Sequence, residues 1–325
     1  MSKSISSPLI NRVINQEHTL GDCHTTQQQL KCLAKSRKHS KQKQDAENLQ
    51  KQLPATLQRC MELSQEKGAS VWLTALPIDN YGFALHKSAC RDALSLRYDW
   101  PFNNQPSYCN CGHSFSIDHA LSCPTGGFPS IRHNEVRDIT ASLLSEVCHG
   151  VSVEPHLQSL SGETMSQRSA NTDYNSRLDV SAYGFWGGRF ERAFFDVRVF
   201  NPCTRSNRQA SLQSTYRRHE QEKKRQYEQR IREVEHSTFT PLVLSTTGGM
   251  GRAATTFFKR LAAMLSERRD VPYSKMMGWI RCRLSFTLLR ASIISVRGAR
   301  SSASKGALHE PIDLQAAEGQ LPHHV

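Results

Sequence analysis

Asp179 and Asp196 are the residues of this sequence whose type and spacing point most directly to catalysis. They lie symmetrically about Gly187 and Gly188, so a tight two-residue turn there would place the two carboxylates opposite each other on neighbouring strands. Facing carboxylates repel, and a bound cation removes that repulsion. Hard oxygen ligands suit Mg²⁺, which also binds the phosphate oxygens of a substrate. A hairpin with a shifted register, in which both carboxylates are solvated, is the alternative.

A third acid and a cation usually accompany two metal-binding carboxylates. Glu135 is the candidate acid, because it lies on an expected helix over residues 131–149 and could reach a metal-bound water; an exposed acid paired with Arg132 is the alternative. Arg198 is one candidate cation, since it shares a strand face with Asp196. A guanidinium does not give up its proton, so Arg198 could serve only as an electrostatic clamp.

Lys223 is the other candidate cation. Asp196 lies about 16 Å before the end of its strand, and a helix that returns from Ser211 covers this distance in about eleven residues. The count ends near Lys223, and Tyr227 is its neighbour one helical turn further on. The helix carries many charges of both signs, so a solvated stripe, or one that follows phosphates, is the alternative.

Cysteines and histidines between residues 106 and 130 form a second chemically competent group. Their spacing is Cys-x-Cys-x₇-His-x₃-Cys, and the candidate ligands are Cys109, Cys111, His119 and Cys123. The first two can bind one ion from a turn, and the last two lie one helical turn apart on the same side. Four nitrogen and sulfur ligands predict a structural, tetrahedral Zn²⁺. The alternative is unrelated loop residues, and His113 is less suitable because it follows Cys111 too closely.

The elements that would position these residues follow the order helix, three strands, helix, strand, helix. We expect helices over residues 131–149, 211–235 and 253–267, and strands over residues 151–155, 176–181, 193–200 and 241–245. This order predicts an α/β fold with a mixed sheet covered by helices, over residues 131–275.

The rest of the chain divides by composition. Residues 1–50 are rich in Gln, Lys and Ser and are expected to form a flexible basic arm, whereas residues 51–105 show helical periodicity. Residues 276–325 are expected to form a basic helix, docked on the core through Ile280 and Leu284, and a flexible tail. Arg283 and Arg290 on this helix could follow a nucleic-acid backbone, with plain surface charge as the alternative.

Composition favours a polyanionic partner. The chain has 42 Lys and Arg against 29 Asp and Glu, a net charge of +13, which makes DNA or RNA the first expectation. No stretch of roughly 20 apolar residues predicts a membrane helix, and the first residues lack the apolar stretch of a signal peptide. The ten cysteines are therefore expected to be reduced thiols and metal ligands.

Asp179, followed after a hairpin by Asp196-Val197-Arg198, resembles the PD-(D/E)xK signature of nucleases, and the element order resembles the restriction-endonuclease-like core. The cysteine and histidine cluster directly ahead of Arg132-His133-Asn134-Glu135 makes the likeness more specific. From roughly Gly68 to Arg300 the chain resembles the C-terminal region of site-specific non-LTR retrotransposon polyproteins, in which a CCHC zinc element precedes a restriction-like endonuclease. Leu178 stands where the signature has Pro.

The resemblance implies that Asp179 and Asp196 bind Mg²⁺ and that Lys223 and Tyr227 belong to a displaced lysine helix, because Arg198 stands where many relatives have Lys. It also implies nicking of target DNA, together with retroelement RNA and a reverse transcriptase. A DNA target implies a nuclear location, with the cytoplasm as a second one. The segment over residues 51–105 would then be the trailing edge of such a polymerase. The alternative function is a catalytically inactive, zinc-containing nucleic-acid-binding protein derived from a retroelement.

Overall fold

The computed structural model describes residues 20–158 and 177–298, and within them the sheet has four strands in the order β1-β2-β3-β4. The strands are β1 (His149–Val153), β2 (Val180–Tyr183), β3 (Arg192–Phe200) and β4 (Thr238–Ser245). The pairs β1–β2 and β2–β3 are antiparallel, and β4 runs parallel to β3. The expected α/β fold with a mixed sheet is therefore confirmed.

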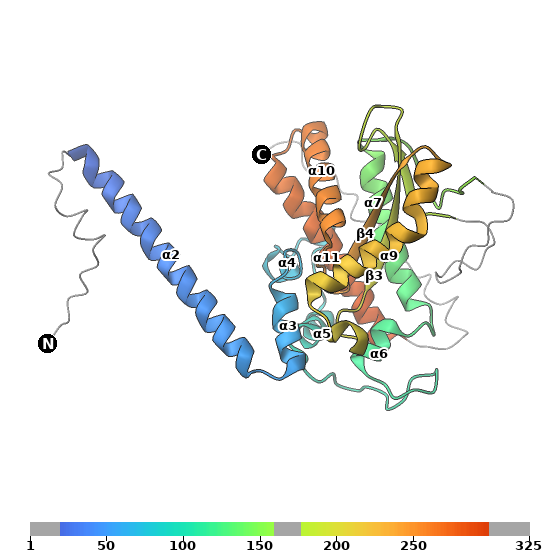
Figure 1. Cartoon of the computed structure of the whole chain (residues 1–325). Helices are drawn as coiled ribbons and strands as arrows, with labels where there is room; N and C mark the ends of the chain where they lie inside the picture. The colour runs from blue at the N-terminus through green and yellow to red at the C-terminus, as the bar shows by residue number, and fades with distance from the viewer. Residues whose placement is uncertain (1–19, 159–176, 299–325) are drawn as a thin grey trace. The chain divides into compact units, whose positions relative to one another are not determined.

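Helices cover both faces of this sheet (Figure 1). On one face lie α7 (Phe128–Ser145) and α10 (Arg252–Arg269), and α11 (Tyr273–Arg297) packs against both. On the other face, α9 (Leu212–Glu233) packs on β3 and β4. α9 occupies this place because two parallel neighbours such as β3 and β4 need a crossover connection, and a helix is the usual one.

Alternating side chains along β3 decide which residues meet which helices. Phe195 and Val197 enter the core formed with α7, α10 and α11. Phe194 faces the other way and packs with Tyr227 of α9. Asp196 follows Phe195 by one residue and therefore lies on the α9 side.

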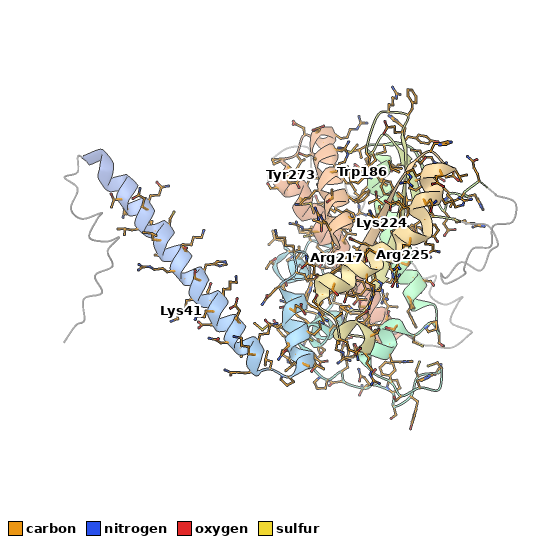
Figure 2. The ribbon with its side chains drawn as sticks, viewed as in Figure 1. Lys41, Trp186, Arg217, Lys224, Arg225 and Tyr273 are labelled. Atoms are coloured by element: carbon orange, nitrogen blue, oxygen red, sulfur yellow. The ribbon has the colours of Figure 1, made fainter. Side chains whose placement is uncertain are left out.

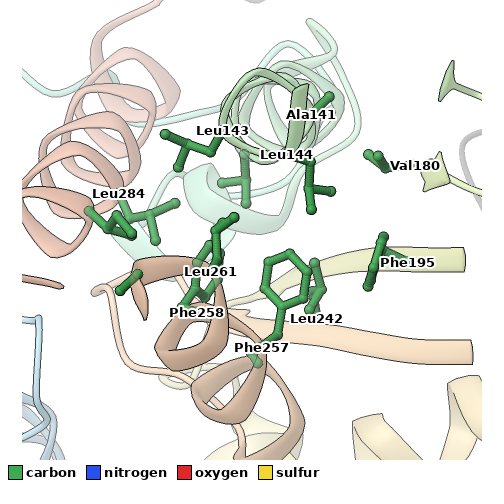
Figure 3. Close-up of a cluster of buried hydrophobic side chains, with 14 of the residues drawn as sticks. Ala141, Leu143, Leu144, Val180, Phe195, Leu242, Phe257, Phe258, Leu261 and Leu284 are labelled. Carbon is green, nitrogen blue, oxygen red and sulfur yellow. The ribbon is translucent and has the colours of Figure 1, made fainter. Parts of the chain in front are cut away.

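The main core fills the space between the sheet, α7, α10 and α11 (Figure 3). Its labelled members include Leu143 and Leu144 of α7, Val180, Phe195 and Leu242 of the strands, Phe257, Phe258 and Leu261 of α10, and Leu284 of α11. Each large side chain buried here stabilises the fold by about 1.5 to 3 kcal/mol relative to an exposed one. This core holds α7 and β3 in place, and these two elements carry His133 and Asp196.

Short helices precede and punctuate the α/β region. They are α3 (Ala55–Ser64), α4 (Val71–Thr74), η1 (Asp79–Tyr81), α5 (Lys87–Tyr98), α6 (Ile117–Ser122) and α8 (Arg205–Arg208). α4, α5 and α6 contact α11, and Arg297 of α11 forms an ion pair of 2.6 Å with Asp92 of α5. The C-terminal helix is thus docked on the core, as its periodicity predicted, and also holds the preceding helices.

The contacts divide the chain into residues 1–58 and residues 59–325. In the first unit, the expectation of a flexible basic arm is wrong where the structure describes it, because Leu20–Gln52 forms the helix α2. Gln, Lys, Ala, Leu and Glu favour helices even when they bury nothing, and the side chains described for α2 are nearly all exposed. Residues 1–19 and the expected tail after residue 298 lie outside the described residues.

Candidate active site and metal centre

β2 and β3 bring Asp179 and Asp196 to neighbouring positions. Val180 pairs with Phe195 in an antiparallel register, and one further step in that register places Asp179 opposite Asp196. The symmetry of the two aspartates in the sequence therefore predicted their pairing.

The prediction of a tight two-residue turn at Gly187 and Gly188 is wrong. β2 and β3 are joined by a longer loop over residues 184–191. Phe185 is fully buried, and Trp186 packs against the same core, so these side chains anchor the chain before it can turn back. The loop remains centred on the two glycines, which is why the register is unchanged.

Asp196 forms an ion pair with Lys223 of α9. Lys223 Nζ lies 2.7 Å from Asp196 Oδ2, and Asp196 is only 4% exposed. Burial raises the pKa of Asp196 to about 6, and the charge of Lys223 opposes this rise while that of Asp179 adds to it. Burial is the largest single influence and would lower the pKa of Lys223, but the charge and hydrogen bond of Asp196, together with the charges of Tyr227 and Asp179, outweigh it and raise the pKa. Lys223 therefore remains a cation beside the two carboxylates.

Asp179 is held by two donors from different elements. Its Oδ1 lies 2.9 Å from His133 Nε2 of α7, and its Oδ2 accepts a hydrogen bond of 2.6 Å from the backbone N–H of Val197. Burial lowers the pKa of His133, but the hydrogen bond to Asp179 and the charges of both aspartates outweigh it and raise the pKa. The pair of carboxylates is thus flanked by one cation from α9 and one titrating imidazole from α7.

The sequence pattern indicated Glu135 on α7 as the third acid and gave no sign of His133. Glu135 is two residues further along, about 200° around the helix, so it points away from the face that His133 presents to Asp179. No hydrogen bond or ion pair joins Glu135 to Asp179 or Asp196 within the described part of the chain. Its pKa is raised by burial and by the neighbouring charge of Asp138. The structure therefore does not bring Glu135 into the site.

Arg198 shares the face of β3 with Asp196, as expected, but its charge is used elsewhere. Arg198 Nη1 donates to Glu222 of α9 at 2.7 Å. Of the two candidate cations, Lys223 is the one that contacts Asp196.

Tyr227 packs beside Lys223, whose Nζ lies 5.6 Å from the centroid of the ring. Burial raises the pKa of Tyr227 to about 12, so the phenol stays protonated at neutral pH. Gln226 donates to its hydroxyl at 3.0 Å. The ring therefore packs beside the lysine, and within the described residues no hydrogen bond joins its hydroxyl to either aspartate.

Leu178, which stands before Asp179, makes a contact that proline could not make. Its backbone N–H donates to the carbonyl oxygen of Pro155 at 3.3 Å, and its side chain is buried. Proline lacks this donor. The departure from the nuclease signature is thus accommodated by the pairing of this segment with the chain after β1.

The cysteine and histidine cluster is assembled by a turn and by α6. Gly112 has a φ of 88°, a conformation that glycine adopts without strain, and its N–H donates to Cys109 O at 2.9 Å. Ser116 caps α6 by accepting a hydrogen bond of 3.1 Å from the backbone N–H of His119. Cys109, Cys111, His119 and Cys123 offer ligand atoms that all lie within 4.8 Å of one another.

The distances within this cluster match those around a single ion. Cys109 Sγ lies 3.8 Å from Cys123 Sγ, and Cys111 Sγ lies 3.1 Å from His119 Nε2. A tetrahedron with Zn–S bonds of about 2.3 Å has S···S edges of about 3.8 Å. The cluster could therefore hold a metal ion such as zinc, and across residues 20–158 and 177–298 it is the one such group of three or more His, Cys, Asp or Glu residues.

The two arginines expected to bind nucleic acid on α11 are half-buried. Arg290 Nη2 donates to the carbonyl oxygens of Gly82 and Ala84 at 2.5 and 2.9 Å. Arg283 lies with its guanidinium 5.0 Å from the ring centroid of Trp279. Arg290 in particular is used to hold α11 to the preceding segment, so the structure gives it a role within the fold.

No protein-family model matches the chain, and no curated protein sequence matches it either. The helices that the structure describes include none with the length and apolar character needed to cross a membrane. An assignment of function therefore rests on the residues of the two sites.

Proposed function

We propose that the chain is a Mg²⁺-dependent endonuclease module of a retrotransposon-derived protein, which hydrolyses phosphodiester bonds and nicks its target DNA. The observation that carries the proposal is the meeting of four side chains in one place: Asp196 of β3, Asp179 directly before β2, Lys223 of α9 and His133 of α7. Perturbed pKa values and a close cluster of opposite charges are typical of catalytic sites.

The donor set fits a hard divalent cation. Asp179 comes directly before β2 and Asp196 lies on the neighbouring strand β3, and the charge of Asp179 raises the pKa of Asp196, which is the repulsion that a cation would relieve. When bound, Mg²⁺ supplies Lewis acidity and lowers the pKa of a bound water. Lys223 would place positive charge beside the phosphate, and His133 would hold Asp179 in a fixed orientation.

The restriction-endonuclease-like core is part of this proposal. A helix, three antiparallel strands, a crossover helix and a parallel fourth strand support it, with Asp196 on the third strand and Asp179 directly before the second. The zinc element would be structural, since four protein ligands leave no open position for a substrate. Target DNA, retroelement RNA, a reverse transcriptase and a nuclear location follow from the resemblance and remain proposals.

Nicking of supercoiled plasmid DNA tests the activity. We expect the purified chain to convert it to the open circle with Mg²⁺ and not with EDTA. Asp179→Ala and Asp196→Ala should each reduce nicking at least about a hundredfold, because each removes a metal ligand. DNA binding, measured without added Mg²⁺, should remain close to that of the unmodified protein, because neither change removes a phosphate contact.

A zinc-containing nucleic-acid-binding protein without nuclease activity is the competing function, supported by the net charge of +13. It predicts DNA binding with no Mg²⁺-dependent nicking in any preparation. Equal loss of DNA binding in both aspartate variants would also count against the nuclease, because it would indicate a disrupted fold.

A further inference from the structure

The outward face of α9 carries only polar and charged side chains. Its exposed residues are Gln213, Ser214, Arg217, Gln221, Lys224, Arg225, Gln226, Gln229, Arg232 and Glu233. Arg217, Lys224 and Arg225 are labelled along this helix in Figure 2. α9 is described over its whole length, and its exposed positions include no aromatic residue.

Two of the four acids of α9 are engaged with other elements of the protein. Glu222 pairs with Arg198 of β3 at 2.7 Å, and Glu220 accepts a hydrogen bond of 2.9 Å from the backbone N–H of Ala253. In the described part of the chain, neither Arg217 nor Arg225 has a carboxylate partner within ion-pair distance. Glu220 and Glu222 are thus turned toward the protein, whereas Arg217 and Arg225 are exposed to solvent.

Lys224 does form an exposed pair of 3.3 Å with Glu228, four residues on. Pairs of this kind contribute less than about 0.5 kcal/mol and are screened by salt. Lys224 can therefore exchange this partner for a phosphate at little cost.

The three cations lie on one side of the helix. Arg217 and Lys224 are separated by about 10 Å of axial rise and point in nearly the same direction, and Arg225 lies about 100° around the helix from Lys224. Lys223, which reaches Asp196, points about 100° the other way from Lys224. Cations spaced along one side of a helix fit the regular phosphates of a duplex, whereas proteins that bind single strands also need aromatic rings on which bases stack.

We propose that this face of α9, through Arg217, Lys224 and Arg225, binds the sugar–phosphate backbone of duplex DNA beside the Asp179–Asp196 pair. The choice of DNA rests on the proposed function, whereas the preference for a duplex over a single strand rests on the side chains of α9. The contacts carry no sequence information and set the position of the duplex relative to the carboxylates.

A triple variant with a charge-matched control tests this surface. Arg217→Gln, Lys224→Gln and Arg225→Gln are combined in one chain, and Lys259→Gln, Arg268→Gln and Lys275→Gln in another; all six residues are exposed, and the control residues lie on α10 and α11. Binding of a fluorescent 30-base-pair duplex is measured by anisotropy at several salt concentrations without added Mg²⁺. Thermal unfolding confirms that both variants are folded.

We expect the α9 variant to bind duplex DNA at least tenfold more weakly at about 0.1 M salt, with a log K versus log salt slope that is flatter by about two to three units. The control, which loses the same net charge, should change affinity by less than about threefold. Equal affinities of the two variants would overturn the proposal. An equal loss for a single strand of the same length would overturn the assignment to duplex DNA.

The same binding assay separates this proposal from the nuclease. Cleavage is not needed for the readout, so a chain that never nicks plasmid DNA can still show the α9 effect. Conversely, the chain could show Mg²⁺-dependent nicking while its α9 variant binds DNA normally. That result would support the nuclease proposal and overturn the proposed α9 binding surface. If the triple variant fails to fold, the single changes Arg217→Gln and Arg225→Gln are each expected to flatten the slope by about one unit.

Discussion

Lys223 Nζ, on α9, lies 2.7 Å from Asp196 Oδ2, on β3. This contact joins the crossover helix to β3, and it also holds a positive charge beside the two carboxylates of the proposed active site. One ion pair therefore connects the stability of the α/β core to the chemistry proposed for it.

The stability of the Lys223–Asp196 pair can be measured with a double-mutant cycle. Lys223→Met leaves a buried carboxylate without its cation, so the free energy of unfolding at pH 7.5 should fall by about 3 kcal/mol. Asp196→Asn combined with Lys223→Met should recover most of this loss, because it removes the buried charge, yet it should not restore nicking. Urea unfolding provides the measurement, and Lys224→Met, an exposed neighbour, is the control. A loss no larger than that of the control would contradict the buried ion pair.

The sequence predicts Glu135 as the third residue of the site, whereas the structure places His133 beside Asp179. His133→Ala removes the imidazole that holds Asp179, so we expect nicking to slow by about 10- to 100-fold with DNA binding retained. Glu135→Ala should leave the rate within about threefold, because no contact connects it to the carboxylates. Initial nicking rates at saturating Mg²⁺ provide the comparison, and the reverse ranking would restore Glu135 as the third acid.

Elemental analysis of the purified chain should give one zinc ion per molecule. Cys109→Ser combined with Cys123→Ser should release it and unfold residues 106–130, because metal binding and local folding are coupled. His113→Ala is the matched test of ligand choice. Its zinc content should be unchanged, whereas His119→Ala should lose the ion; loss of zinc in the His113 variant alone would assign the fourth ligand differently.

The raised pKa of Glu66 should make the stability of the folded chain depend on pH. Burial raises the pKa of Glu66 to about 7, although the hydroxyl groups of Tyr216 and Ser245 favour the ionised form, and the charges of Glu62 and Arg59 nearly oppose each other. The folded chain therefore keeps a proton that the unfolded chain loses, so stability is fully present below pH 4.5 and falls as pH rises toward 7.

Glu66→Gln should remove this loss. At pH 8 the variant should be more stable than the unmodified chain by about 2 to 3 kcal/mol, and at pH 4 the two should be nearly equal. Urea unfolding at both pH values measures the difference, with Glu267→Gln reporting the effect of removing one exposed carboxylate. An equal gain at both pH values would mean that the effect does not come from the proton on Glu66.

The order of elements and the meeting of Asp179 with Asp196 could be predicted because both depend on local patterns. Strand alternation fixes which residues face the same side, and symmetry about Gly187 fixes the register even though the loop is longer than expected. Lys223 followed from helix rise alone. The spacing of the three cysteines and His119 likewise predicted that their side chains form one cluster.

The rest depended on tertiary contacts that no local pattern encodes. His133 and Glu135 are equally plausible on a helix until the direction of that helix over the sheet is known. From the sequence, Arg290 is expected to be an exposed cation. In the structure it links α11 to residues 82–84, because the carbonyl oxygens of Gly82 and Ala84 lie beside its guanidinium. α2 was expected to be flexible since it buries nothing, which neglected the helix propensity of its residues.

α11 is made after every helix that it contacts, which are α4, α5, α6, α7 and α10. At about 5 to 20 residues per second, the time between synthesis of Cys123 and of Arg297 is on the order of 10 to 30 seconds. During this interval the cysteine and histidine cluster exists without the helix that later covers Ala120. An ion captured on the ribosome would keep the element folded until then, so we expect the supply of zinc during translation to set the yield of folded chain.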